Sequence, residues 1–222
     1  MWQPIARPMS ANTPRIEMDA GLEIGYGTPL ARVGTKIQLS SGTHFLVARN
    51  GRGKTTLLRT LAGSIKPVSG HFEMHGFVQY LAENIRFDQE LPTKRIFNAL
   101  LQKDGIDDAF ELADRTELDV AKPYGKLSTG NKRKANLIVA ECSTHPDGNI
   151  LLLDEPLSGL DVFVRQTFEE LWNNSNKGVL RLVSCHPDYD SMKMPSSLLI
   201  EDGHIRHLNE PGQKWNDLKG LI

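Results

Sequence analysis

A phosphate-binding loop is the first chemistry that the sequence indicates. In the stretch LVARNGRGKTTLLRTLAG, an apolar run meets a loop with two glycines, followed by Lys54, Thr55 and a helical pattern. Backbone N–H groups of such a loop point at phosphate oxygens, at the positive end of the following helix. Lys54 would reach the β- and γ-phosphates, and the Thr55 hydroxyl would bind Mg²⁺. Ala48 stands where the pattern has glycine, and a glycine turn before a surface helix is the simpler alternative.

The whole turn supplies candidate nucleotide contacts. Gly51 and Gly53 would let the backbone pass close to a ligand, and Arg49 and Arg52 add positive charge around the phosphates. The candidate phosphate-binding residues are Asn50, Gly51, Arg52, Gly53, Lys54, Thr55 and Thr56.

A carboxylate pair forms the second candidate site. The stretch NILLLDEP places Asp154 and Glu155 at the end of an apolar strand, about a hundred residues after the glycine loop. Ligands of α/β sheets bind at this carboxyl edge. Asp154 would hold Mg²⁺, directly or through water, and Glu155 would polarise the water that attacks the γ-phosphate. Charged pairs at strand exits are common, but together with the glycine loop this pair favours a nucleotide site.

The stretch KLSTGNKRK contains a second helix start that could bind an anion. Ser128 suits a helix N-cap, and Gly130 lets another group approach the backbone. This helix start could hold a γ-phosphate on the side opposite the glycine loop. In the simpler alternative Ser128 only caps a helix, and Lys132, Arg133 and Lys134 form a solvated basic face.

Together these stretches resemble the ATP-binding cassette (ABC) family, specifically its nucleotide-binding subunit, from about residue 21 to residue 208. LSTGN is similar to the family's LSGGQ signature. The resemblance implies that Tyr26, in GYG, stacks on adenine, and that Asp161, in SGLD, lies at a dimer contact. It also implies that His186, at the end of LVSCH, is a switch histidine at the catalytic site. Without the resemblance, Tyr26 could be a core tyrosine and His186 a structural histidine.

Two of the departures from the family pattern concern Glu83 and Asn131. Glu83 stands where the family carries a glutamine that contacts Mg²⁺ and the attacking water, and Asn131 replaces the last glutamine of the signature. A carboxylate at position 83 could bind the metal more strongly, but it adds negative charge near the γ-phosphate. Arg49 and Arg52 are candidates to offset part of that charge.

The resemblance also implies partners. Two cassettes, identical or homologous, would dimerise head to tail, so that the glycine loop of one and the signature of the other enclose each ATP. A separate transmembrane permease subunit would contact the helical insert, about residues 84–125, and couple hydrolysis to transport. The NKRK ending is more like that of cassettes paired with small exporter-type membrane subunits, which favours export. The expected location is the cytoplasmic face of the inner or plasma membrane.

Composition agrees with a globular intracellular protein. The 222 residues are 39% hydrophobic and 24% charged, which is ample for a core. The net charge of −1 offers no global basic field for nucleic acid. The two cysteines have no metal-like spacing, which fits a reducing compartment. No apolar run approaches the ~18 residues that span a bilayer.

Alternating strand-like and helical stretches predict an α/β fold. We expect a P-loop NTPase core with a mostly parallel sheet, a small antiparallel β portion at the N-terminal side, and an inserted α-helical subdomain. Residues 1–19 are expected to be a loose lead-in, and 20–222 a single ABC ATPase domain. Within the helical insert, Asp104 to Asp108 are expected to break the helix.

Two other functional classes remain open at this point. One is a soluble ABC-type ATPase in DNA repair, iron–sulfur assembly or translation, and the other is an unrelated P-loop kinase or GTPase. Co-purification with a polytopic membrane protein would separate the transporter subunit from the soluble ATPase. A nucleotide-specificity assay would separate both from the kinase or GTPase. The transported cargo is not encoded in these motifs, because specificity in this family lies mainly in the membrane subunit.

Overall fold

The computed structural model describes residues 13–174, 178–184 and 192–221. The strands are β1 (Arg15–Met18), β2 (Glu23–Gly25), β3 (Pro29–Val33), β4 (Ile37–Leu39), β5 (Gly42–Val47), β6 (Phe72–His75), β7 (Phe77–Leu81), β8 (Asn149–Leu153), β9 (Val179–Ser184), β10 (Ser196–Glu201) and β11 (His204–Asn209). The helices are α1 (Lys54–Leu61), α2 (Thr93–Leu100), α3 (Lys103–Arg115), α4 (Thr129–Cys142), α5 (Val162–Asn174) and α6 (Trp215–Leu218), with short 3₁₀ turns at Tyr124–Lys126 and Lys219–Leu221.

The main sheet is mostly parallel, which confirms the expected fold class. Its strand order is β2-β3-β11-β10-β5-β9-β8-β7, and the five strands from β10 to β7 are parallel to one another. The hairpin of β10 and β11 turns at Asp202 and Gly203, a residue pair that favours tight hairpin turns because both positions take positive φ. In this order β8 lies between β7 and β9, so the ends of all three strands meet at one edge.

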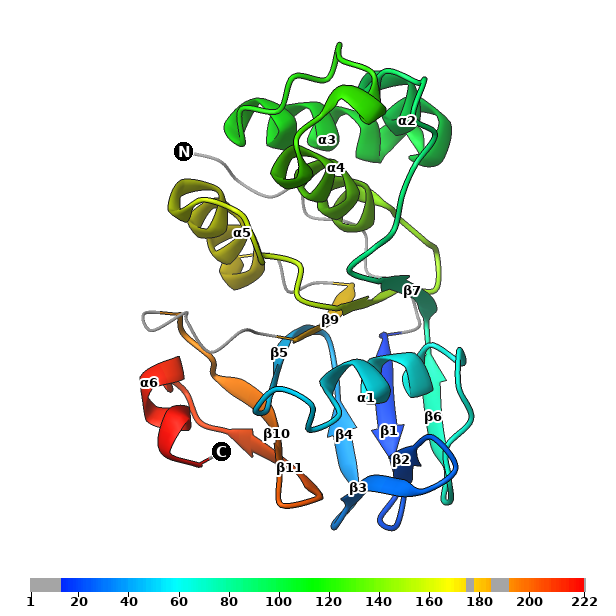
Figure 1. Ribbon diagram of the computed structural model, residues 1–222, viewed down its shortest axis with the longest axis vertical. Helices are drawn as coiled ribbons and strands as arrows, with labels where there is room; N and C mark the ends of the chain where they lie inside the picture. Colours follow the sequence, from blue (N-terminus) through cyan, green and yellow to red (C-terminus); the bar gives the residue numbers. More distant parts are fainter. Residues whose placement is uncertain (1–12, 175–177, 185–191, 222) are drawn as a thin grey trace.

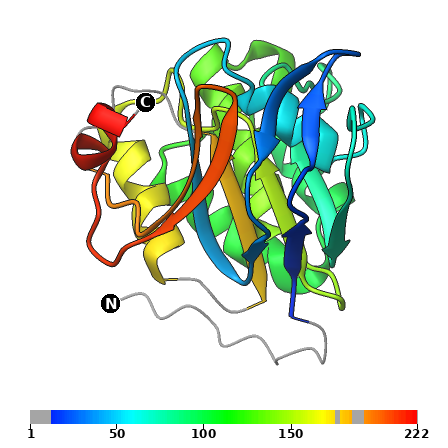
Figure 2. The ribbon, with the colours of Figure 1, turned by 90° about the horizontal axis from the view of Figure 1, so that it is seen from below.

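Both faces of β8, which lies between two parallel strands, are buried along its whole length, which explains why its sequence is apolar without alternation. Successive side chains of a strand point to opposite faces. On β8, Ile150 and Leu152 belong to the core cluster that includes α1, whereas Leu151 and Leu153 belong to the cluster that includes α3, α4 and α5. Helices α2 to α5 lie on one side of the main sheet (Figures 1 and 2).

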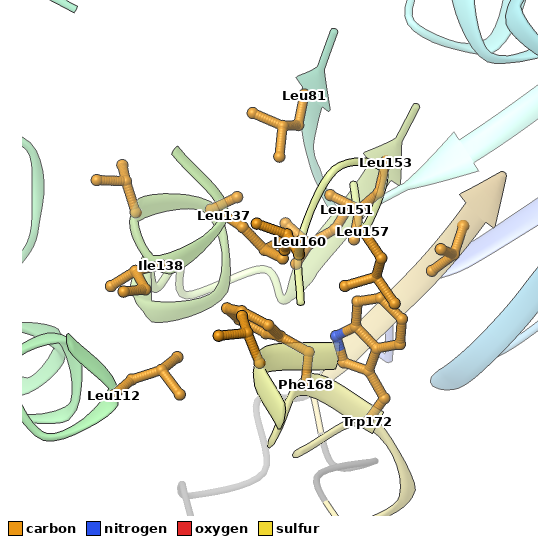
Figure 3. Close-up of a cluster of buried hydrophobic side chains, with 14 of the residues drawn as sticks. Leu81, Leu112, Leu137, Ile138, Leu151, Leu153, Leu157, Leu160, Phe168 and Trp172 are labelled. Atoms are coloured by element: carbon orange, nitrogen blue, oxygen red, sulfur yellow. The ribbon is translucent and has the colours of Figure 1, made fainter. Parts of the chain in front are cut away.

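The helical side has one continuous apolar core. Figure 3 shows leucines of β7 and β8 packed with side chains of α3, α4 and α5, among them Leu112, Leu137 and Phe168. The helical side therefore packs on one face of β7 and β8, the strands that lead to Glu83 and Asp154.

The insert differs from expectation at one point. Residues 104–108, expected to interrupt the helix, lie inside α3, and the break falls before them at Leu101 and Gln102, which have extended backbone. Gly105 has a packing role, because a Cβ atom there would lie 2.1 Å from the carbonyl oxygen of Cys142. The glycine lets α3 approach α4 closely, and this tertiary contact outweighs its low helix propensity.

A second, antiparallel sheet of order β4-β1-β6 lies at the N-terminal side, as predicted. Figure 1 shows α1 close to this sheet, and side chains of β1, β4 and α1 share one core cluster with β8. The central strand of this sheet, β1 (Arg15–Met18), falls within residues 1–19, expected to be a loose lead-in. That boundary is wrong at residues 15–18, because Ile16 and Met18 are fully buried.

A buried ion pair joins the helices to the sheet. Arg181 of β9 donates from Nε and Nη2 to Glu141 of α4 at 2.9 and 2.8 Å, and Trp172 of α5 donates to Glu141 at 2.7 Å. Arg181 is 1% exposed and Glu141 5% exposed. Two helices and one strand of the main sheet therefore meet at one carboxylate.

Replacing one partner of this pair is expected to destabilise the fold strongly. Arg181→Ala leaves the Glu141 carboxylate buried without its counter-charge, a change that typically costs about 3–5 kcal/mol. Denaturant unfolding measures the loss. The control is Arg206→Ala, which removes an exposed pair with Glu201 and should cost at most about 1 kcal/mol. Equal losses in the two variants would contradict the structural role of Arg181.

Candidate functional site

The glycine loop occupies the turn between β5 and α1. Gly53, the residue before α1, has φ 112°, and Gly51 has φ 77°. A Cβ atom on Gly53 would also lie 3.2 Å from the Leu30 side chain, so both backbone conformation and space favour glycine there. Ala48 is 1% exposed, does not have positive φ, and packs its methyl group in the core. Alanine therefore fits the position where the P-loop pattern has glycine.

A cavity of about 340 Å³ lies over this turn. Its lining residues are Asn50, Gly51, Gly53, Lys54, Thr55, Thr56 and Glu155. The Lys54 ammonium donates to the Ala48 carbonyl oxygen at 3.0 Å, which holds it beside the loop, and Glu155 is the one acidic residue of the lining. Arg49 and Arg52 are exposed, and neither is part of the lining.

Asp154 receives hydroxyl hydrogen bonds from three neighbouring elements. Thr55 of α1 and Ser184 of β9 donate to its Oδ1 at 3.2 and 3.0 Å. Tyr80 of β7 donates to its Oδ2 at 3.2 Å. Asp154 is 5% exposed, so these contacts satisfy a carboxylate that is almost completely buried. Burial raises the pKa of the Tyr80 phenol, which keeps this hydroxyl protonated and able to donate at neutral pH.

These residues fit a Mg²⁺-nucleotide site. Mg²⁺ in phosphate-transfer sites is usually held by one or two protein oxygens and by the phosphates of the substrate. Thr55 lines the cavity and its hydroxyl donates to the Asp154 carboxylate, and Lys54 supplies a cation for the phosphates. The sequence predicts that Lys54, Thr55, Asp154 and Glu155 lie close together, and in the structure they are neighbours.

Glu155 has an unusual backbone. Its φ of 47° is left-handed, which a non-glycine residue seldom adopts. Its N–H donates to Ser184 Oγ at 2.7 Å, and its carbonyl oxygen accepts from Arg133 at 3.2 Å. The strained turn directs the side chain to the cavity while the backbone is held on both sides.

The other candidates lie outside this cavity. Ser128 caps α4, accepting from the Asn131 N–H at 3.2 Å, and Asp161 caps α5, accepting from the Val164 N–H at 2.9 Å. A Cβ atom on Gly130 would lie 3.5 Å from the Gly159 carbonyl oxygen. Tyr26 is 62% exposed and its hydroxyl accepts from Arg59 at 3.2 Å.

Glu83 follows β7, and its carboxylate faces Arg133, with Oε1 3.6 Å from Nη2. Neither Arg49 nor Arg52, the candidates to offset its charge, has a described contact with it. The expected switch residue, His186, lies outside the described residues.

Sequence reasoning missed three contributors: Tyr80, Ser184 and Arg133. Tyr80 and Ser184 stand at the ends of the strands that flank β8, so finding them required the strand order.

The basic run after the signature is not a solvated face. Lys134 is 8% exposed and donates to the Thr116 carbonyl oxygen at 2.8 Å, and Arg133 binds loop carbonyls.

The comparisons with known proteins agree with this geometry. The family model described as "ABC transporter" matches residues 34–158, more than half of the chain. The chain belongs to the ABC transporter family. The matched range of this ABC chain contains the glycine loop, Glu83, the LSTGN stretch and the Asp154–Glu155 pair, whereas Tyr26, Asp161 and His186 lie outside it.

Its relatives are ATP-binding proteins named for both directions of transport. The chain is 36% identical over 149 residues to the cytochrome c biogenesis ATP-binding export protein CcmA of Zymomonas mobilis, covering 65% of this chain and 66%, just under two thirds, of that protein. It is 31% identical over 204 residues to the aliphatic sulfonates import ATP-binding protein SsuB of Corynebacterium glutamicum, covering 84% of this chain and 81% of that protein.

Solved structures confirm the fold. A bacterial Atm1-family ABC exporter with ATP bound superposes with a TM-score of 0.70 at 16% identity, over 94% of this chain and 41% of that longer chain. None of the helices formed by the described residues is both long enough and apolar enough to cross a membrane.

Lys54→Ala is expected to abolish most ATP binding by this ABC chain. The ammonium lies at the cavity wall, and charge-assisted contacts to phosphate contribute roughly 1.5–3 kcal/mol each, or about 10- to 100-fold in affinity. Titration calorimetry with ATP and Mg²⁺ measures the change. Lys66→Ala, which removes an exposed lysine beyond α1, is the matched control and should bind as the wild type does. Wild-type affinity in Lys54→Ala would refute the assigned site.

Proposed function

We propose that this chain is the ATP-hydrolysing subunit of an ABC transporter and energises transport by a separate transmembrane permease. The observation that carries the proposal is the cavity over the glycine loop. The cavity is lined by Lys54, Thr55 and one carboxylate, Glu155, and the Thr55 hydroxyl donates to the buried Asp154. This arrangement supports binding of a triphosphate and hydrolysis by a positioned base.

Each side chain has a specific role in this proposal. Lys54 and the N–H groups of residues 50–56 bind the phosphates, Thr55 and Asp154 hold Mg²⁺, and Glu155 accepts a proton from the attacking water. Bound Mg²⁺ would neutralise charge that develops on the phosphates. Tyr26 would stack on adenine, and Glu83 would be a secondary ligand near the metal. His186 would act as the second catalytic residue.

The proposal includes a second cassette, either a copy of this chain or a homologue. Ser128 and Gly130 lie at the start of α4 and do not line the cavity of their own chain. Their contribution to the γ-phosphate would therefore be made to the ATP of the partner cassette, with Asp161 at the contact between the two. Val162 and Phe163, next to Asp161, are 65% and 58% exposed, which supports a contact surface there.

The permease would contact the helical insert, at about residues 84–125, on the cytoplasmic face of the inner or plasma membrane.

We propose export as the direction, on the basis of the similarity to a protein named for export, at 36% identity. The relative named for import is 31% identical. The net charge of −1 supports a function without nucleic acid.

The two carboxylates should differ in their effect on hydrolysis. Glu155→Gln should lower the steady-state ATPase rate by roughly 10²–10⁴-fold, as expected for loss of a general base. Glu83→Gln should leave the rate within about tenfold, because a secondary ligand contributes a modest term. Purified variants, ideally with the permease, are compared in one phosphate-release assay. If Glu83→Gln is the inactive enzyme and Glu155→Gln is active, the assigned roles are reversed.

ATP should promote dimerisation when hydrolysis is blocked. In a Glu155→Gln variant, ATP would persist between the glycine loop of one chain and Ser128 of the other. Light scattering should then show a rise from the 24.8 kDa monomer to twice that mass. Addition of Lys54→Ala to the same variant removes the nucleotide and should restore the monomer. A monomer at saturating ATP counts against the two-cassette arrangement.

A further inference from the structure

Arg133 of α4 binds the loop that carries Glu155. Its Nη1 donates to the carbonyl oxygens of Glu155 at 3.2 Å and of Ser158 at 2.8 Å. The Arg133 side chain is 15% exposed, so this contact is mostly shielded from water. One side chain of α4 therefore binds two carbonyl oxygens of the turn that follows β8.

The other nitrogen of the same guanidinium faces the loop after β7. Nη2 lies 3.4 Å from the Glu83 carbonyl oxygen and 3.6 Å from Glu83 Oε1. Because a guanidinium is planar and its donors have a fixed geometry, contacts made by one nitrogen orient the other. Arg133 thus connects the two loops that bear the acidic residues of the candidate site.

The Glu155 backbone requires such support. Its left-handed φ of 47° is unfavourable for a residue with a side chain, and it persists only where the surroundings hold it. Ser184 holds the N–H of Glu155, and Arg133 holds its carbonyl oxygen. Loss of either contact would let the turn relax and move the carboxylate relative to the cavity.

We propose that Arg133 is a positioning residue for Glu155, and that Glu83 orients Arg133 through their ion pair. This inference rests on the proposed ATPase function and adds a part to it. Glu83 carries a negative charge where the family pattern has a neutral amide, and the opposite charge of Arg133 faces it. The ion pair links α4 to the loop after β7, and the carbonyl contacts of Arg133 link α4 to the loop that carries Glu155.

Arg133→Gln tests the proposal directly. It should lower kcat for ATP hydrolysis by about 10- to 100-fold, because displacement of a catalytic group by about 1 Å can cost that much. The ATP dissociation constant should stay within about threefold, since Arg133 does not line the cavity. The matched control is Lys132→Gln, whose ammonium lies 5.7 Å from the centre of the Tyr124 ring; both constants should be unchanged.

Further variants separate positioning from a general effect on folding. Arg133→Lys keeps the charge and one donor group, so it should recover part of the lost kcat. Arg133→Gln combined with Glu155→Gln should be no slower than Glu155→Gln alone in single-turnover phosphate release, because Arg133 acts through Glu155. A further loss in the double variant, equal to that in the single one, would overturn the proposal. Thermal unfolding of every variant identifies any that fail to fold. If Arg133→Gln fails to fold, the kcat of Arg133→Lys decides whether Arg133 positions Glu155.

Failure of this inference is distinguishable from failure of the proposed function. A folded wild-type chain that does not hydrolyse ATP would refute the proposed function. A wild-type chain that does, together with an Arg133→Gln variant of the same kcat, would refute only the role of Arg133.

Discussion

The arrangement of this site depends on how the buried carboxylate of Asp154 is satisfied. A carboxylate that is 5% exposed must accept hydrogen bonds, and here the donors are hydroxyls of Thr55, Tyr80 and Ser184. They come from α1 and from the two strands beside β8, so the order of the parallel strands and the position of the glycine loop must both be correct for them to meet. Ser184 also accepts the N–H of Glu155, which extends the same network to the proposed base.

The helical side of the molecule is connected to this network by side chains of α4. In the core, Glu141 accepts hydrogen bonds from Arg181 and Trp172. Arg133 donates to the loop that follows β8. Because one helix carries both contacts and Ser128 caps its N-terminus, a displacement of that end would move Arg133 relative to the Glu155 loop. This geometry gives a physical route by which a partner that contacts the helical insert could influence hydrolysis.

Local sequence patterns were sufficient for the glycine loop, for the strand that ends at Asp154 and for the hairpin at Asp202 and Gly203, because each depends on neighbouring residues. Local patterns were not sufficient where tertiary contacts determine the conformation or the position of a residue. Gly105 resembles a helix breaker but lies inside α3, since α3 must approach the backbone of α4. Arg133 looked like part of a solvated face, and only the fold brings it to Glu83 and Glu155. Tyr80 and Ser184 likewise became site residues only through strand order.

The central claim is that Thr55, Asp154 and Glu155 form a Mg²⁺-dependent site of ATP hydrolysis. It is tested most directly by inorganic phosphate release from ATP by the folded wild-type chain, with Mg²⁺ and again with excess EDTA. The account predicts steady release with Mg²⁺ and its loss in EDTA, because the hydroxyl–carboxylate pair is placed to hold the ion. Release that continues unchanged in EDTA, or no release with Mg²⁺, would contradict it.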